Sequence, residues 1–110
     1  MDAIEDFNKR VLPLLRYYII YKLRDEGLNE LEISKRLRIT QAAVSKALNN
    51  RYKIDGKKVM ELLLNDKESA KLVDKIKDSI KEMNYKEAQA NICKLCYLKT
   101  NQSCVLGESL

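Results

Sequence analysis

The chain has 110 residues, of which 21 are Lys or Arg, 16 are Asp or Glu and none is His, so its formal net charge is +5. That length allows one domain with at most a short extension. The balance of 45% hydrophobic and 34% charged residues is typical of a folded protein rather than a disordered tail. One proline and three glycines leave little material for hairpins and long loops, so we expect an all-α fold.

The absence of histidine excludes several classes of enzyme. The chain cannot form a Ser-His-Asp triad, a Cys-His nucleophile pair or a zinc site with a histidine ligand. Neither a phosphate-binding P-loop nor a glycine-rich dinucleotide-binding loop occurs in the sequence. We therefore expect a protein that is not an enzyme.

The sequence also lacks the signals of membrane insertion and export. No stretch approaches the roughly 20 apolar residues of a transmembrane helix, and the acidic start Met1–Asp6 is unlike a signal peptide. These observations predict a cytoplasmic protein without a membrane partner. Three cysteines in a reducing compartment suggest metal or redox chemistry more than a disulfide framework.

All of the positive surplus lies in one segment, residues 29–58. The segment holds three acidic residues and eight basic ones, which are Lys35, Arg36, Arg38, Lys46, Arg51, Lys53, Lys57 and Lys58. The rest of the chain holds 13 basic and 13 acidic residues and is neutral. Such a concentration indicates a nucleic-acid partner or, equally well, an ordinary solvated basic face.

The first expected helices lie before residue 27. A short helix is expected within the first ten residues, around Ile4 and Phe7. Leu12–Leu14 then opens a longer helix, because proline is favoured in a first turn. Residues 14–23 are apolar on nearly all sides, which predicts a helix that is either central to a bundle or buried on two sides. Gly27 stands where a left-handed cap would end that helix.

Two short helices with clear capping signals come next. Asn29 and Glu32 form a capping box for the first, over residues 30–37. A tight connection follows, and Thr40 caps the second, over residues 41–49. This arrangement is typical of a DNA-binding helix-turn-helix and also of an ordinary helical hairpin. Small or polar residues on the outer face of the second helix favour the helix-turn-helix, and they are Gln41, Ala42, Ser45, Lys46 and Asn49.

An Asp-Gly turn signal follows this corner. Since no second strand is available for a β-wing, we predict a loop and then a helix over Val59–Asn65. The residues of that helix expected to close the core are Met60, Leu63 and Leu64. A DNA-binding domain would then span residues 1–65.

A C-terminal extension, residues 66–110, contains two further predicted helices. Asp66 caps the first, which runs to about Met83, and the second covers about residues 86–98. The apolar residues of the first form a narrow seam at Val73, Ile76, Ile80 and Met83. The seam fits either a homodimer interface or packing onto the chain's own bundle.

The order and spacing of these signals resemble a known family. The strings Val11–Arg16, Asp25–Leu28, Glu32–Leu37 and Ile39–Leu48 are similar to predicted archaeal transcriptional regulators with a lambda-repressor-like helix-turn-helix. In some relatives this module is fused to a thiamine-phosphate synthase-like domain, but no thiamine link is carried over to this chain. One departure is Arg38, at a turn position where glycine is usual because the backbone is often left-handed there. Either the turn differs here, or Arg38 bears the strain and reaches a phosphate.

The resemblance implies an all-α, lambda-repressor-like bundle with a helical, Cys-containing extension, which binds double-stranded DNA as a homodimer with residues 41–49 in the major groove. The residues expected to read bases are Thr40, Gln41, Ala42, Ser45, Lys46 and Asn49. Those expected to hold phosphates are Lys35, Arg38, Arg51 and Lys53. The sequence thus predicts a sequence-specific transcriptional regulator, and the alternative is a helical protein-interaction module without specific DNA binding.

Three cysteines mark the end of the chain. A Cys93-x-x-Cys96 pair followed by Cys104 is similar to a cysteine-rich ending in the same family, in which a histidine closely follows the last cysteine. That ligand is missing here, and zinc and iron–sulfur sites normally take four protein ligands. Three interpretations stay open: zinc or an iron–sulfur cluster completed from outside, a redox-active thiol pair or disulfide, and thiols without a function.

Overall fold

The structure, a computed structural model, describes residues 3–49 and 56–101 of the chain. The elements in chain order are α1 (Ala3–Asp6), the π-helical segment η1 (Phe7–Val11), α2 (Leu12–Asp25), α3 (Glu30–Leu37), α4 (Gln41–Asn49), α5 (Gly56–Leu62), α6 (Lys67–Lys81) and α7 (Tyr85–Thr100). The described residues contain no strand, which confirms the predicted all-α class, and none of their helices is long and apolar enough to cross a membrane. Most of the predicted loop, with its β-wing alternative, falls in the gap between the two ranges, outside the described residues, but its last residues, 56–58, belong to helix α5.

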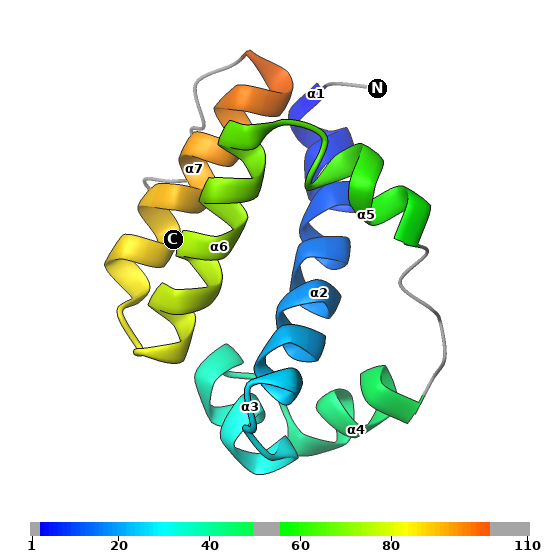
Figure 1. Cartoon of the computed structure of the whole chain (residues 1–110), viewed down its shortest axis with the longest axis vertical. Helices are drawn as coiled ribbons and strands as arrows, with labels where there is room; N and C mark the ends of the chain where they lie inside the picture. The colour runs from blue at the N-terminus through cyan, green and yellow to red at the C-terminus, as the bar shows by residue number, and fades with distance from the viewer. Residues whose placement is uncertain (1–2, 50–55, 102–110) are drawn as a thin grey trace.

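Helix α2 occupies the centre of the molecule. In Figure 1 it runs between the α6–α7 hairpin and α5, with α3 and α4 gathered at its C-terminal end. Leu15, Ile19, Ile20 and Leu23 are each no more than 2% exposed, whereas Tyr17 is 41% exposed, so α2 is buried on one broad face and not all round. Burying one such side chain stabilises a fold by about 1.5–3 kcal/mol, so α2 supplies a large share of the core.

The end of α2 is set by a left-handed glycine. Gly27 has a φ of +98°, its N–H donates to the Arg24 carbonyl, and the N–H of Leu28 donates to the Leu23 carbonyl over 3.1 Å. These two bonds form a Schellman motif, in which Leu28 and Leu23 are both buried. The left-handed cap predicted at Gly27 is confirmed.

The predicted capping box of α3 is also present. The Asn29 side chain accepts a hydrogen bond from the Glu32 N–H at 2.8 Å, and the Glu32 carboxylate accepts one from the Asn29 N–H at 3.1 Å. Leu28 before the cap and Ile33 inside the helix are both buried, which fixes the angle at which the chain enters α3. The glycine cap and this box together turn the chain sharply between α2 and α3.

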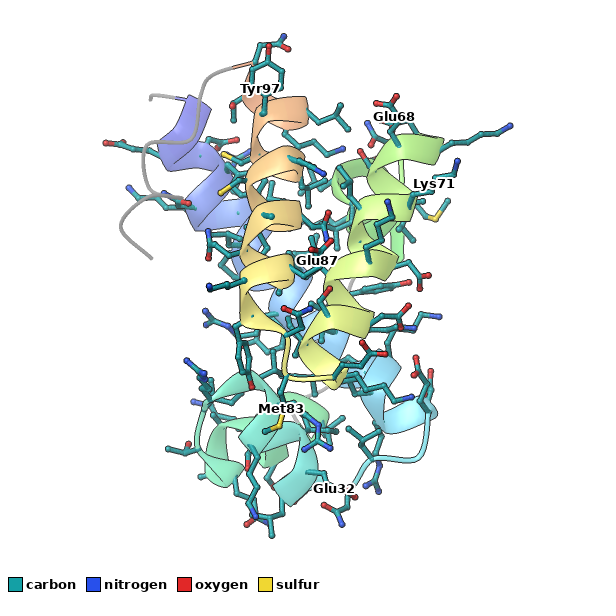
Figure 2. All side chains as sticks on the ribbon, turned by 90° about the vertical axis from the view of Figure 1, so that its left-hand side faces the viewer. Glu32, Glu68, Lys71, Met83, Glu87 and Tyr97 are labelled. Atoms are coloured by element: carbon teal, nitrogen blue, oxygen red, sulfur yellow. The ribbon has the colours of Figure 1, made fainter. Side chains whose placement is uncertain are left out.

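Helices α6 and α7 form a hairpin that packs along α2, and they lie side by side in Figure 1 and Figure 2. Asp66 caps α6, as predicted, by accepting a hydrogen bond from the Ser69 N–H at 2.7 Å. Val73, Ile76 and Ile80 are buried, so this part of the predicted seam packs onto the chain's own bundle. Core residues from both sides of position 66 belong to one hydrophobic cluster.

The corner between α6 and α7 comes slightly earlier than predicted. α6 ends at Lys81 rather than at about Met83, because Met83 has a left-handed backbone with a φ of +61°. Its side chain is 48% exposed at the corner (Figure 2), so it does not join the buried seam. α7 then begins at Tyr85, with Asn84 as its cap, and continues to Thr100.

Helix α5 also differs from its prediction, since it covers Gly56–Leu62 rather than Val59–Asn65. Val59 and Leu63 are buried, whereas Met60 is 58% exposed and does not close the core. Helix geometry explains the exposure of Met60. Val59 and Leu63 are one turn apart on the buried face, and Met60 is rotated by about 100° from Val59.

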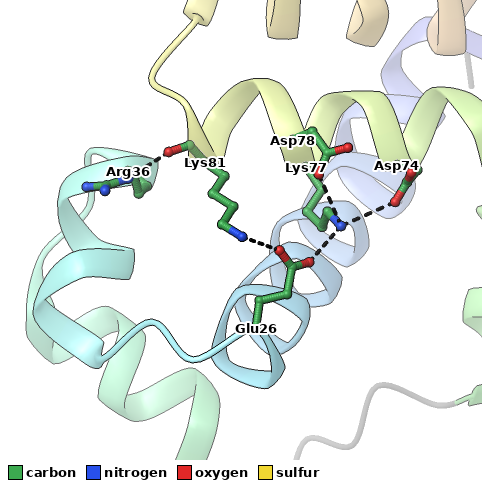
Figure 3. Close-up of polar contacts among 6 residues, drawn as sticks. All are labelled: Glu26, Arg36, Asp74, Lys77, Asp78 and Lys81. Carbon is green, nitrogen blue, oxygen red and sulfur yellow. Dashed lines mark hydrogen bonds and ion pairs between the residues drawn. The ribbon is translucent and has the colours of Figure 1, made fainter.

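An ion-pair network ties the C-terminal end of α2 to α6 (Figure 3). The Glu26 carboxylate binds Lys77 and Lys81, each at 2.6 Å, and Lys77 also contacts Asp74 at 3.3 Å and Asp78 at 3.2 Å. The Lys77 side chain is only 13% exposed, so its charge is partly removed from water. Hydrogen bonds from the two lysines hold the pKa of the Glu26 carboxyl below its usual value, and Glu26 raises the pKa of Lys77.

We expect Glu26→Gln to lower the free energy of unfolding at neutral pH by about 1 kcal/mol, since the amide loses both ion pairs. Because the folded-state pKa of Glu26 is depressed, its contribution is present above pH 4.5 and is lost as the pH falls through the folded-state pKa. Urea denaturation should therefore show a difference between the two proteins at neutral pH that shrinks on acidification. Glu61→Gln removes an exposed carboxylate outside this network and should change little. An equal loss in that control would contradict the prediction.

Candidate nucleic-acid interface

Helices α3 and α4 meet at a corner whose shape is set by a left-handed residue. Arg38 has a φ of +56° and a ψ of +42°, and the N–H groups of Arg38 and Ile39 both donate to the Ser34 carbonyl. The Thr40 hydroxyl accepts a hydrogen bond from the Ala43 N–H at 3.1 Å, which confirms Thr40 as the cap of α4. Glycine would adopt the conformation of Arg38 easily, whereas a residue with a Cβ adopts it at a cost of roughly 1–2 kcal/mol.

The inner face of α4 is anchored in the core. Val44 and Ala47 are 0% and 4% exposed and belong to the same buried cluster as Ile33 of α3. The Tyr21 hydroxyl on α2 donates to the Ala47 carbonyl at 2.9 Å. These contacts fix α4 against α2 and α3, so its opposite face is held toward solvent in one orientation.

The outer face of α4 carries the side chains predicted to read bases. Five of them are exposed: Thr40, Gln41, Ala42, Lys46 and Asn49. Ser45 is half-buried, and its hydroxyl accepts a hydrogen bond from the Asn49 amide at 3.1 Å. The six residues thus lie together on α4 and its cap, and the exposed ones are small, polar or basic.

The predicted phosphate-binding residues divide into two pairs. Lys35, near the C-terminal end of α3, and Arg38, in the connection to α4, are both exposed. Arg51 and Lys53 lie outside the described residues. The structure therefore places the first pair at the corner itself and does not bear on the second.

Tyr85, on α7, holds the corner in place and was missed from the sequence. The Arg38 guanidinium lies over its ring, 3.9 Å from the centroid, and its hydroxyl donates to the Arg36 carbonyl at 2.7 Å. Arg36 in turn donates from Nε to the Lys81 carbonyl at 2.8 Å (Figure 3). In the sequence Tyr85 marks only a break between two helices, a local signal that says nothing about its distant partners.

Two further residues beside α4 were not predicted. Arg16 and Tyr17 of α2 line a small groove of about 170 Å³ together with Ile39 and Ala43. Arg16 is exposed, so it adds a cation next to α4. In the sequence Arg16 is the single charge within the apolar run 12–21, which does not reveal which neighbour it faces.

Cys93 and Cys96 lie one turn apart on α7 in different surroundings. Cys96 is 1% exposed within the core. Cys93 is half-buried, accepts a hydrogen bond from the Gln89 amide at 3.4 Å and lines a groove between α6 and α7. Cys104 lies outside the described residues, and the zinc or iron–sulfur hypothesis depends on it. Within residues 3–49 and 56–101, no group of three or more Cys, Asp or Glu side chains is arranged to hold a metal ion.

Comparison with known proteins gave no match: no family model fits the chain, and no curated protein and no solved structure is significantly similar to it. What the chain does must therefore be inferred from its own residues.

The strained corner yields a stability prediction. Arg38→Ala keeps the left-handed backbone but loses the contact with Tyr85, so it should lower the free energy of unfolding by about 0.5–1 kcal/mol. Arg38→Gly loses the same contact but relieves the strain, so it should be about 1 kcal/mol more stable than Arg38→Ala. Urea denaturation measures both variants, and equal stabilities would show that the backbone of residue 38 is not left-handed.

Proposed function

We propose that the chain is a sequence-specific DNA-binding transcriptional regulator in which α3 and α4 form a lambda-repressor-like helix-turn-helix. The observation that carries the proposal is the contrast between the two faces of α4. Val44 and Ala47 anchor one face in the core, and the exposed face offers only small, polar and basic side chains. Such a face suits the floor of a major groove, where base edges present hydrogen-bond donors, acceptors and methyl groups.

The exposed residues of α4 have the chemistry needed to read bases. The Gln41 amide can pair with adenine through two hydrogen bonds, because it carries both a donor and an acceptor. Ala42 is small enough to contact a thymine methyl group, and Lys46 can donate to guanine. Gln41 and Ala42 lie in the first turn of α4, the end that a recognition helix usually directs at the base edges.

The cations around the corner would hold the DNA backbone. Lys35 and Arg38 are exposed beside the start of α4, and Arg16 adds a third cation from α2. Arg38 can still bind a phosphate while it stacks on Tyr85, because a guanidinium stacks by its face and donates by its edge. We propose Arg51 and Lys53 for the same role from the sequence alone.

One such module covers a short stretch of DNA, so we propose that the protein binds as a homodimer on a two-fold site. Its half-sites would lie about 10 bp apart or a multiple of that spacing. Because Val73, Ile76 and Ile80 are buried within the chain, the dimer interface would use other surfaces.

The cysteines would make this regulator responsive to metal or redox state. In one form, Cys93 and Cys96 would bind zinc or an iron–sulfur cluster together with Cys104 and one outside ligand. In the other form, an oxidant would convert a pair of these thiols to a disulfide. Anaerobic purification with a visible spectrum and metal analysis tests this part of the proposal. A colourless, metal-free protein whose DNA affinity is unchanged by oxidants would contradict it.

Gln41→Ala should weaken binding to the preferred duplex by about 1–3 kcal/mol and relax the preference at one base position. Selection of duplexes from a random pool, followed by affinity measurements, gives both quantities. Asn65→Ala, between α5 and α6, removes an exposed side-chain amide outside α3 and α4 and should leave the preference intact. If Gln41→Ala left the preference unchanged, the assigned reading face would be wrong.

Lys35→Ala should weaken binding to all duplexes alike and reduce the slope of log affinity against log salt by about 1. Lys94→Ala, which removes an exposed lysine from α7, is the matched control and should keep the slope of the unmodified protein. Affinities measured over a range of salt concentrations give the slope for each variant. A shallow slope for the unmodified chain would favour the alternative function, a protein-interaction module.

A further inference from the structure

A groove lies behind the α3–α4 corner, where the end of α3 meets the α6–α7 hairpin. It encloses about 660 Å³, which is within the size range of small-molecule sites in proteins. Leu37, Ile80 and Ile92 supply apolar surface from α3, α6 and α7, and Tyr85 adds an aromatic ring. The groove is therefore built from elements that are far apart in the sequence.

The charges that line this groove are all positive. Arg36, Arg38 and Lys86 line it, and none of the lining residues within the described part of the chain is an Asp or a Glu. Three cations gathered beside apolar surface create a positive potential that water screens less than on an open face. An anion entering the groove would meet no opposing carboxylate among these lining residues.

The two arginines are already oriented by other contacts. Arg36 uses Nε to donate to the Lys81 carbonyl at 2.8 Å, and Arg38 rests its face on the Tyr85 ring. Each guanidinium still has Nη groups along its edge that can donate to an oxyanion. Because their positions are fixed beforehand, binding an anion would immobilise few additional side-chain torsions.

We propose that this groove binds a small organic anion with an apolar body, its carboxylate, sulfonate or phosphate group on the three cations and its body on Leu37, Ile80 and Ile92. The regulatory part of this proposal rests on the proposed function: Arg38 is shared between the groove and the DNA backbone, so the bound anion lowers affinity for DNA. A backbone phosphate is the less suitable occupant, because it would leave the apolar surface of the groove uncovered.

The site is tested on the full chain without DNA, with anilinonaphthalene sulfonate as the probe. This fluorescent sulfonate has an aromatic body and should bind the folded protein at one site, with increased emission. Lys86→Glu should weaken that binding at least about tenfold, the effect of losing one charge-assisted hydrogen bond. Lys86 is exposed, so the variant should keep its fold, which thermal unfolding verifies.

Lys94→Glu is the matched control, because Lys94 lines the separate groove of about 520 Å³ between α6 and α7. It should leave probe binding unchanged. Binding that is insensitive to Lys86→Glu, or lost in Lys94→Glu instead, would overturn the proposal. It would also be overturned if Lys86→Glu weakened DNA binding while leaving probe binding unchanged, since the groove would then be a phosphate contact.

The regulatory part is tested by adding a mixed-sequence duplex at low salt. The probe should lower DNA affinity in the unmodified chain and have a smaller effect in Lys86→Glu. Saturating probe that leaves the DNA affinity of the unmodified chain unchanged would overturn the regulatory part. If the probe binds through Lys86 but the chain binds no DNA, the anion site stands and the proposed function fails.

Discussion

The fold depends on one constraint, which is that α2 is largely apolar and must bury its aliphatic face, although Arg16 and Tyr17 stay exposed. Leu15, Ile19, Ile20 and Leu23 are almost completely buried, and α2 contacts α3, α4 and α6. The chain therefore places the α3–α4 corner at one end of α2 and the α6–α7 hairpin along its length (Figure 1). As a result, the candidate interface and the C-terminal hairpin share one core. A change in the packing of either one is transmitted to the other through α2.

Polar contacts reinforce this coupling at one point of the molecule. Glu26 is held by Lys77 and Lys81, and the Lys81 carbonyl accepts a hydrogen bond from Arg36 (Figure 3). Tyr85 then contacts the last turn of α3 through its hydroxyl and the connection through its ring. The hairpin thus helps to position the end of α3 and the connection that leads into α4. If the protein regulates transcription, a ligand bound at the hairpin would lie only a few contacts away from the exposed face of α4.

The parts of the fold that the sequence predicted are those with local causes. The caps at Gly27, Asn29 and Asp66 depend on neighbouring residues, and the sequence shows those neighbours directly. The exposure of Met60 and the partners of Tyr85 depend on how distant helices pack, which no local pattern contains. The candidate site shows the same division. The outer face of α4 followed from helical periodicity, whereas Arg16 and the basic groove required the tertiary arrangement.

The left-handed turn at Arg38 has a consequence for motion. A glycine turn samples many backbone conformations, and a residue with a side chain samples far fewer, in the unfolded chain as well as in the folded one. Arg38 is restrained further by the ring of Tyr85. We therefore expect the angle between α3 and α4 to vary less with thermal motion than it would around a glycine. If α3 and α4 bind DNA as proposed, a rigid pair of helices loses less conformational entropy on binding than a flexible pair.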